Sequence, residues 1–587
     1  MHVVATAGHV DHGKSTLVRA LTGMEPDRLA EERRRGLTVD LGFVWTTLPT
    51  GEDVAFVDVP GHERFVPTML AGVGPVPAVM FVVAADEGWK PQSAEHLAAL
   101  EAYGVQHGLL VITRADLADP GAAMAQGQTE LAGTSLDAAD TVAVSATTGA
   151  GLDDLRAALR RLARALPPPD RAEPVRLWVD RAFSIRGSGT VVTGTLAGGT
   201  LRVGDELLVE PGGRAVRVRG LESLKTRHAA VGAVARVAVN LRGEGLTGVR
   251  RGAALCTPGR WLVSDLLDVR VRGVPAPDLA AQALLHIGSA AVTAGVRPLG
   301  ADVVRLRLTE PLPLRIGDRA VLRDPGSRRL AGLVVLDVRP PGLGRRGAAA
   351  ARATELAGMS ERGDGAGELR RRGLVRAGEL RAMGAEPPSA PLVGDWLVDP
   401  ALWVRLGERL VAVVEAYAAA APLESGLPVE AARQRLGLPD RQLLEALVRP
   451  PLALRNGRIA VSGGRLDGLP VTVQRAVEAV RADLAAAPFV APDAARLAAL
   501  GLGSRELAAA VRAGLLLRVS GGVYLLPGAD QEAVRLLAAV EQPFTLSAAR
   551  QALGTTRRVA VPLLELLDAQ RLTRRLPDDR RVVAASG

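Results

Sequence analysis

The segment Gly8-His-Val-Asp-His-Gly-Lys14-Ser15 constrains this chain more than any other stretch of its sequence. It fits the pattern GxxxxGK[ST], follows the apolar run HVVATA and precedes a stretch of helical character. Glycines let backbone N–H groups turn inward around phosphate, and the next helix presents its positive N-terminus to it. The sequence predicts a strand, a nucleotide-phosphate loop and a helix, with these residues in contact: Gly8, His9, Val10, Asp11, His12, Gly13, Lys14, Ser15 and Thr16.

Lysine is rare in this chain: Lys14, Lys90 and Lys225 stand beside a large excess of arginine. A lysine kept in such a sequence can do what a planar guanidinium cannot. We expect the compact Lys14 ammonium to reach between β and γ phosphates, and the Ser15 hydroxyl to bind Mg²⁺.

Two later motifs supply the other parts of a phosphate-hydrolysing site. In Asp58-Val-Pro-Gly61-His62, Asp58 is expected to hold Mg²⁺ through water, Gly61 to approach the γ-phosphate, and His62 to orient the attacking water as the catalytic residue. Between the loop and this motif, Thr38 is expected to bind Mg²⁺ only when γ-phosphate is present. The run Glu31 to Gly36 before it also fits a charged surface helix.

A third motif indicates which base is bound. The Asp116 carboxylate in Thr113-Arg114-Ala-Asp116 can accept both N1–H and N2–H of guanine. Thr113 and Arg114 depart from the usual Asn-Lys-x-Asp pattern, although Arg114 can still stack on the base. Ser145-Ala146 is expected to place an N–H near guanine O6. The cofactors predicted are GTP or GDP and Mg²⁺, with GTP hydrolysis as the reaction.

Residue patterns divide the chain into several domains, because 587 residues exceed one core. Residues 1–170 alternate strands and helices, residues 174–262 and 263–342 have short Val-rich strands of two β-barrels, and residues 368–587 are helical. Residues 166–174 and 342–367 are predicted linkers. Hairpin tips recur at 454–462, 517–526 and 574–583, which favours winged-helix units, with a generic helical repeat as the alternative.

Composition indicates which partners and which cellular compartment suit the protein. A net charge of +9 and a pI near 10.5 suit an RNA partner, or a solvated surface in an arginine-rich proteome. The lone Cys256 excludes an internal disulfide. No charged-then-apolar leader and no run of 18 apolar residues is seen, so we expect a cytoplasmic monomer without a membrane partner.

The motifs GHVDHGKST, RGLTVD, DVPGH and TRAD resemble those of translational elongation factors of the Tu type. The segment FSIRGSGTVVTG is similar to the start of their tRNA-binding barrel, so the resemblance covers about residues 1–340. With its long helical extension, the chain resembles the SelB family, the selenocysteine-specific elongation factors. This resemblance implies a multidomain fold: an α/β P-loop GTPase domain, two β-barrels and four winged-helix modules, the last at about 530–587.

The same resemblance implies the partners. They are selenocysteyl-tRNA, the ribosome at recoded UGA codons, and an mRNA hairpin (the SECIS element) that the last module binds, with GTP hydrolysis releasing the tRNA. The aminoacyl pocket would contain Asp180, Arg181 and Arg236, since arginines favour an ionised selenol over a neutral hydroxyl. Asp40 and Asp180 could orient the arginines. Arg181 and Arg236 as scaffold residues are the alternative.

The last module has an arginine-rich surface in the sequence. Arginines that follow a helix cap at Thr555-Thr556, and others at the tip of a hairpin, are predicted to contact RNA. The alternative is that they form a solvated charged face. Pro562 would kink the helix that begins at this cap. The predicted contacts are Arg557, Arg558, Arg574, Arg575, Arg580 and Arg581.

Two other functions fit parts of the sequence. One is another translational GTPase, of the initiation or rescue type. The other is a nucleotide-sensing DNA-binding regulator, which the winged modules alone would support.

Overall fold

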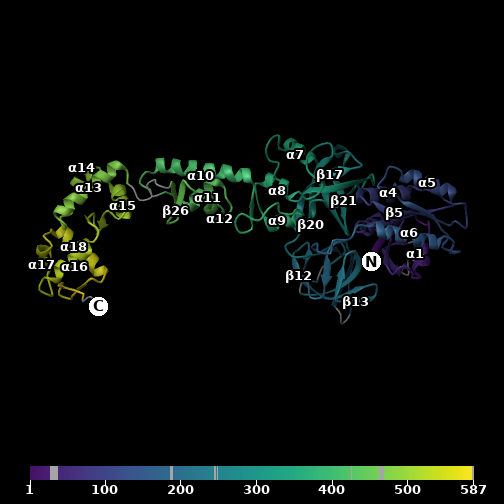
Figure 1. Cartoon of the computed structure of the whole chain (residues 1–587), viewed down its shortest axis with the longest axis horizontal. Coiled ribbons are helices and arrows are strands. Elements are labelled where there is room, and N and C mark those ends of the chain that lie inside the picture. Colours follow the sequence, from purple (N-terminus) through teal and green to yellow (C-terminus); the bar gives the residue numbers. More distant parts are fainter. Residues whose placement is uncertain are drawn as a thin grey trace. The chain divides into compact units, whose positions relative to one another are not determined.

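The computed structural model describes residues 1–26, 38–185, 189–243, 246, 249–424, 426–461 and 469–584 (Figure 1). The chain divides into two compact units, residues 1–390 and 391–587. The predicted surface helix at Glu31 to Gly36 lies outside the described residues. None of the described helices is long and apolar enough to cross a membrane.

The first unit begins with a six-stranded sheet of order β2-β3-β1-β4-β5-β6, in which β2 alone is antiparallel to its neighbour. Its strands are β1 (His2–Ala7), β2 (Gly42–Thr47), β3 (Asp53–Asp58), β4 (Ala78–Ala84), β5 (His107–Thr113) and β6 (Asp140–Ala143). Its helices are α1 (Lys14–Thr22), η1 (Glu63–Phe65), α3 (Val66–Val73), α4 (Pro91–Tyr103), α5 (Gly121–Leu131) and α6 (Leu152–Ala165). The predicted parallel, helix-covered sheet is confirmed, and the loops after β1, β3 and β5 leave the same edge.

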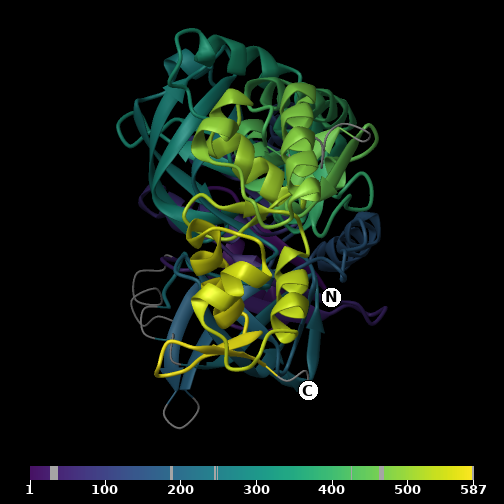
Figure 2. The ribbon, with the colours of Figure 1, turned by 90° about the vertical axis from the view of Figure 1, so that its left-hand side faces the viewer.

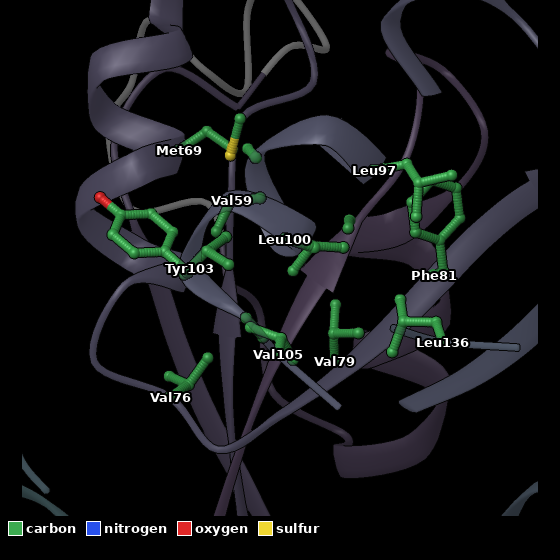
Figure 3. Close-up of a cluster of buried hydrophobic side chains, with 14 of the residues drawn as sticks. Val59, Met69, Val76, Val79, Phe81, Leu97, Leu100, Tyr103, Val105 and Leu136 are labelled. Atoms are coloured by element: carbon green, nitrogen blue, oxygen red, sulfur yellow. The ribbon is translucent and has the colours of Figure 1, made fainter. Parts of the chain in front are cut away.

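A cluster of apolar side chains fixes this sheet to its helices. Phe81 on β4 and Leu100 on α4 are buried there, with Met69 of α3 on the same side of the sheet (Figure 3). β4 is buried along its whole length, as expected of a central parallel strand. The core therefore holds the loop-bearing edge rigid.

Two β-barrel domains follow. The first has strands β7 (Arg176–Trp178), β8 (Arg181–Ile185), β9 (Gly189–Leu196), β10 (Thr200–Arg202), β11 (Glu206–Glu210), β12 (Arg214–Ser223), β13 (Thr226–His228), β14 (Ala230–Gly232), β15 (Ala235–Arg242) and β16 (Ala254–Cys256). The second is a closed barrel of order β17-β20-β19-β18-β21-β22. Its strands are β17 (Leu262–Arg272), β18 (Gln282–Ile287), β19 (Ala290–Pro298), β20 (Val303–Leu314), β21 (Arg319–Arg323) and β22 (Leu330–Asp337), with η3 (Ala276–Asp278).

The nucleotide-type domain packs on the second barrel through α4, which contacts β21 and β22. A Cβ at Gly332 would lie 2.8 Å from the Cα of Ala102, so only glycine allows this approach of helix and strand. Glu63 and Arg328 add an ion pair of 2.8 Å across the same junction. The segment directly after the Asp58 motif is thereby joined to the second barrel.

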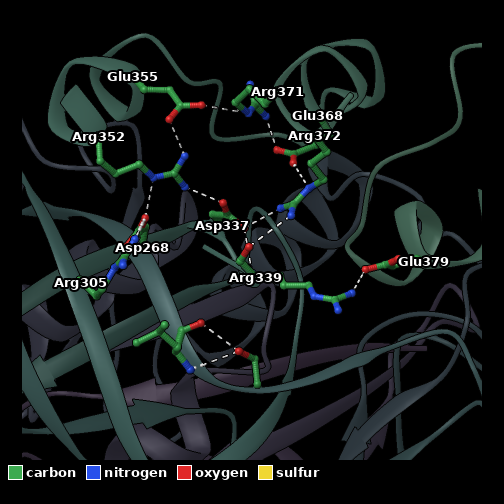
Figure 4. A network of polar contacts seen from close by, with 12 residues as sticks. Asp268, Arg305, Asp337, Arg339, Arg352, Glu355, Glu368, Arg371, Arg372 and Glu379 are labelled. Atoms are coloured by element: carbon green, nitrogen blue, oxygen red, sulfur yellow. Dashed lines mark hydrogen bonds and ion pairs between the residues drawn. The ribbon is translucent and has the colours of Figure 1, made fainter. Parts of the chain in front are cut away.

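The predicted linker at 342–367 is wrong over part of its length, because α7 (Ala348–Ala357) lies within it. Arg352 of α7 is buried and binds Asp268 at 2.7 Å and Asp337 at 2.5 Å (Figure 4). The sequence gives no sign of these two barrel carboxylates, which hold the helix in place. α8 (Gly365–Arg372), β23 (Leu374–Arg376) and α9 (Ala377–Ala382) complete this unit.

The second unit repeats a pattern of helices followed by a short hairpin. The unit begins with β24 (Trp396–Val398). One module then contains α10 (Pro400–Ala420), β25 (Leu427–Pro428), α11 (Val429–Leu436), α12 (Arg441–Leu447), β26 (Leu452–Arg455) and β27 (Arg458–Val461). The next has α13 (Val471–Ala486), α14 (Ala494–Ala499), α15 (Ser504–Arg512), β28 (Leu517–Arg518) and β29 (Tyr524–Leu525). The last has α16 (Ala529–Ala538), α17 (Leu546–Ala552), α18 (Arg557–Ala569), β30 (Thr573–Arg575) and β31 (Arg581–Val583) (Figure 2, yellow). The hairpins occupy the three predicted tips.

Candidate functional site

The loop between β1 and α1 encloses the Lys14 ammonium. Nζ donates to the carbonyl oxygens of Gly8 at 3.0 Å and His9 at 2.6 Å. Burial lowers the pKa of Lys14 to about 8, although the nearby charges of Asp58 and Asp11 favour the ammonium. The loop therefore holds a cation that is stabilised by carboxylates rather than by water.

Three oxygen-bearing side chains meet beside this loop. Ser15 Oγ donates to Asp58 Oδ2 at 2.6 Å and lies 2.9 Å from Thr38 Oγ1. Thr6 donates to the other Asp58 oxygen at 2.7 Å and so fixes the carboxylate. Two hydroxyls and a carboxylate fit the oxygen preference of Mg²⁺. The residues that the sequence placed at a magnesium site are thus neighbours in space.

Gly61 lies directly against the phosphate loop. A Cβ there would be 2.5 Å from Lys14 Nζ and 2.6 Å from the backbone N of Val10. Any side chain would displace the loop or the ammonium. The next residue, His62, accepts a hydrogen bond from the backbone N–H of Arg64 at Nδ1, 3.2 Å away. This fixes the ring and leaves Nε2 as the nitrogen for another partner.

The base-recognition motif is tied to the same loop. Thr113 is buried and donates from Oγ1 to the carbonyl of His12 at 2.7 Å. Arg114 pairs with Asp86 at 2.9 Å and contacts the carbonyl of Asp11. The threonine thereby bridges β5 and the phosphate loop without an asparagine amide.

The other residues predicted to recognise the base, Asp116 and Ser145-Ala146, have different surroundings. Asp116 has an exposed side chain just beyond β5. Ser145 is buried, donates its backbone N–H to the carbonyl of Ala150 at 2.9 Å and is followed by Ala146. The turn that carries Ala146 is therefore held by its own hydrogen bond.

Two residues of α4 escaped the sequence reasoning. His96 is buried and accepts a hydrogen bond from the N–H of Gly8 at 3.0 Å, and Gln92 accepts one from Val10 at 3.2 Å. Burial lowers the pKa of His96 to about 3, so it is neutral and can accept. Polar residues four apart share a helix face, which was the available signal.

The predicted aminoacyl residues lie where β2 faces the first barrel. Arg236 makes hydrogen bonds with both Asp180 oxygens and Thr195, the latter at 3.2 Å, and Thr193 donates to Asp180 at 2.6 Å. Both Arg236 and Asp180 are nearly buried, at 11% and 7% exposed. The threonines were not predicted, yet they hold this pair in place.

Arg181 is attached to the other domain. Its Nε donates to Asp40 at 3.1 Å and its Nη2 to the carbonyl of Leu41. Asp40 also pairs with Arg251 at 3.4 Å. One carboxylate of the first domain thus orients two arginines of the barrel.

An interdomain hollow of about 260 Å³ separates β2 from the barrel. Phe43 lies beneath both guanidinium groups, with Arg236 Cζ 3.6 Å and Arg181 Cζ 5.1 Å from the ring centroid. The lining includes Phe43, Trp45, Arg181, Thr193, Arg236 and Ala238. The hollow therefore has an apolar wall beside two fixed cations, which suits a small anion.

The six arginines of the last module have different environments. Arg557 is exposed at the start of α18, which continues through Pro562 to Ala569. Arg558 donates to the carbonyls of Ala491 and Pro492, so it supports the preceding module.

The arginines of the β30–β31 hairpin also have different environments. Arg581 is buried against Asp568 at 2.8 Å, so it is unsuited to the RNA contact predicted for it. Arg574 is exposed, whereas Arg575 and Arg580 pair with Asp579 and Asp578 at 2.5 Å on the surface.

Comparison with known proteins agrees with this arrangement. Residues 1–165 match the elongation factor Tu GTP-binding domain, residues 278–342 the β-barrel domain of the selenocysteine-specific elongation factor, and residues 535–582 the winged helix of elongation factor SelB. A selenocysteine-specific elongation factor from Desulfomicrobium baculatum is 31% identical over 99% of each chain. The chain belongs to the selenocysteine-specific elongation factors. A member from Escherichia coli is 38% identical over 59% of this chain and 56% of its own.

Solved structures give the same family. The crystal structure of a bacterial selenocysteine-specific elongation factor aligns over 100% of both chains, with a TM-score of 0.74 and 25% identity. As a member of this family, the chain is a translation elongation factor and GTPase that uses GTP, GDP and Mg²⁺. The predicted fold class is confirmed, and the initiation, rescue and DNA-regulator alternatives are excluded.

Proposed function

We propose that this elongation factor carries selenocysteyl-tRNA and tests its selenium in the interdomain hollow. The observation that carries the proposal is the pair Arg181 and Arg236, both fixed by carboxylates and both over Phe43. A selenol ionises below neutral pH, and a selenolate beside two guanidinium groups makes charge-assisted hydrogen bonds. Exclusion of water by Phe43 strengthens these interactions.

The same hollow disfavours serine. Its hydroxyl stays neutral at physiological pH, so a seryl group would leave two arginines facing the hollow without an anion. The seryl group therefore makes no charge-assisted hydrogen bond to the arginines, and the wrong ligand lacks the interaction that the selenolate gains. Discrimination is the difference between these two binding energies.

The nucleotide site controls the hollow through a short stretch of chain. Thr38, beside the Ser15 hydroxyl, is two residues from Asp40, which binds Arg181. Ser15, Thr38 and Asp58 would hold Mg²⁺, which would supply positive charge beside the phosphates of GTP. Loss of γ-phosphate releases Thr38, moves Asp40 and frees Arg181 from its orientation. His62 orients the water that attacks the γ-phosphate, so hydrolysis releases the aminoacyl group.

At the other end of the chain, exposed arginines contact an mRNA hairpin while the factor is on the ribosome. Arg557, Arg574, Arg575 and Arg580 carry positive charge on the surface of the last module. Phosphate contacts of this kind supply affinity that falls with salt. Arg558 and Arg581 position the module instead.

Substitution of Arg181 tests the discrimination. Arg181→Ala should bring the GTP-dependent affinities for selenocysteyl-tRNA and seryl-tRNA closer together, by about tenfold for loss of one charge-assisted contact. Arg217→Ala, which removes an exposed arginine of β12 outside the hollow, is the control. An unchanged affinity ratio in Arg181→Ala would remove Arg181 from the role.

A further inference from the structure

We propose that helix α4 couples the position of the second barrel to the affinity of the phosphate loop for nucleotide, with Gln92 as the positioning residue at the loop. The N-terminal half of α4 contacts the loop, and its C-terminal turn contacts the barrel. A shift of the barrel against α4 therefore changes how fast nucleotide is released. This inference rests on nucleotide binding by the first domain and does not depend on recognition of the aminoacyl group.

The first turns of α4 hold two backbone N–H groups of the phosphate loop. Gln92 Oε1 accepts from the N–H of Val10 at 3.2 Å. His96 Nδ1 accepts from the N–H of Gly8 at 3.0 Å. Lys14 Nζ donates to the carbonyl of Gly8, also at 3.0 Å, so the Gly8 residue is held by both of its polar backbone groups. The shape of the loop therefore depends on where α4 lies.

The Val10 amide is also close to the Asp58 motif. A Cβ on Gly61 would lie 2.6 Å from the backbone N of Val10 and 2.5 Å from Lys14 Nζ. A displacement of Val10 therefore changes the packing of Gly61 on the loop. Gln92 thus positions the segment of the loop that lies against Gly61 and the Lys14 ammonium.

The last turn of α4 packs directly on the second barrel. A Cβ on Gly332 of β22 would lie 2.8 Å from the Cα of Ala102, so the helix and strand backbones are in close contact. Next to this contact, the guanidinium of Arg319 on β21 occupies the space that a Cβ on Gly104, the C-cap of α4, would fill. Arg319 therefore places a positive charge at the negative end of the helix dipole.

The helix between these two ends is fixed in the core. Its 13 residues span about 20 Å. The buried side chains of one cluster surround it, and they include Leu97 and Leu100 of α4 together with Val321 of the second barrel. Close-packed interiors are hardly compressible and transmit strain. A displacement of the last turn by the barrel is thus passed to Gln92 and His96.

Dissociation of a fluorescent GDP analogue from the full-length protein tests the coupling. Gln92→Met keeps the length of the side chain but removes the acceptor, so it should release GDP about three- to tenfold faster, the effect of one lost hydrogen bond. Gly332→Ala pushes on the opposite end of α4 and should accelerate release about two- to tenfold. In the double variant the two factors should not multiply, because both act through the same contact with the loop.

Gly326→Ala is the matched control in the same barrel. It adds a Cβ in the exposed β21–β22 turn, 3.5 Å from Asp324 Oδ1, and should release GDP at the wild-type rate. Arg319→Ala removes an exposed contact of α4 and should also accelerate release, and it decides the matter if Gly332→Ala does not fold. Wild-type rates in Gln92→Met or in the barrel variants would overturn the coupling, as would factors that multiply in the double variant.

Discussion

Arg236 and Asp180 form a nearly buried ion pair on the face of the first barrel, with Nη2 and Oδ1 3.2 Å apart. The Arg236 guanidinium stacks on Phe43 of the GTPase domain, 3.6 Å from its centroid. A barrel carboxylate and a GTPase-domain ring thus hold one cation from two sides. This geometry makes the position of the cation depend on how the two domains meet.

Arg236→Lys should separate charge from geometry. Lysine keeps the positive charge but loses the two-pronged contact with Asp180 and the planar stacking on Phe43. We expect the selenocysteyl-to-seryl affinity ratio to fall about tenfold in Arg236→Lys and further in Arg236→Met, the variant without charge. Equilibrium binding to both tRNAs with GTP measures the ratio. Wild-type discrimination in Arg236→Met would contradict the account.

Nucleotide binding should take up a proton near pH 8. Burial lowers the pKa of Lys14 to about 8 in the protein, and nucleotide phosphates raise it again by favouring the ammonium. GDP binding should therefore be coupled to uptake of about half a proton at pH 8 and almost none at pH 6.5. Affinity should fall as the pH rises through 8.

Calorimetry in buffers of different ionisation enthalpy measures that uptake. Lys90→Met, which removes a neighbouring half-exposed lysine, should keep it. Equal proton uptake at pH 6.5 and pH 8 in wild type would show that Lys14 is not the linked group.

Arg352→Ala should destabilise the first unit. It leaves Asp268 and Asp337 buried with less compensation, and breaking such a network costs about 3–5 kcal/mol. The first thermal transition should move to a clearly lower temperature. Arg339→Ala removes a 65% exposed partner of Glu379, and its cost should stay below about 1 kcal/mol. Similar shifts in both variants would show that burial of the network is not the cause.

The arginines of the last module should separate into two classes. Arg557→Ala and Arg574→Ala should weaken binding to an mRNA hairpin from a recoded UGA site, each lowering the salt slope by about 1. Arg581→Ala should instead lower the melting temperature of the module, because the Asp568 carboxylate loses its guanidinium partner and keeps only the hydrogen bond from Thr573. Fluorescence anisotropy over a salt series measures the first effect. An unchanged slope in Arg557→Ala would refute contact there.

The local motifs were predictable because their chemistry is contained in a few consecutive residues. Gly8 to Ser15, Asp58 and Thr113 were placed from spacing alone, and the structure brings their side chains together around one loop. The contacts of His96 and Thr193 were missed, because each depends on which strand or helix lies opposite. Such partners follow from topology and register, which single-sequence patterns do not specify.

The error at residues 342–367 has a related cause. Gly, Ala and Arg there are typical of a linker, but alanine also has the highest helix propensity. Tertiary contacts decided between the two, since Arg352 binds a carboxylate 84 residues away in sequence, that of Asp268. Arg581 could not be told from the exposed arginines around it, because a buried arginine and a solvated one look alike in sequence.

The most direct test is the affinity of the wild-type factor for three ligands in the presence of GTP: selenocysteyl-tRNA, its seryl form on the same tRNA, and bulk aminoacyl-tRNA. Because only the selenol is ionised, the account predicts at least tenfold tighter binding of selenocysteyl-tRNA than of seryl-tRNA, and loss of this preference with GDP; about 1.4 kcal/mol corresponds to that factor. Equal affinities for the selenocysteyl and seryl forms would contradict it.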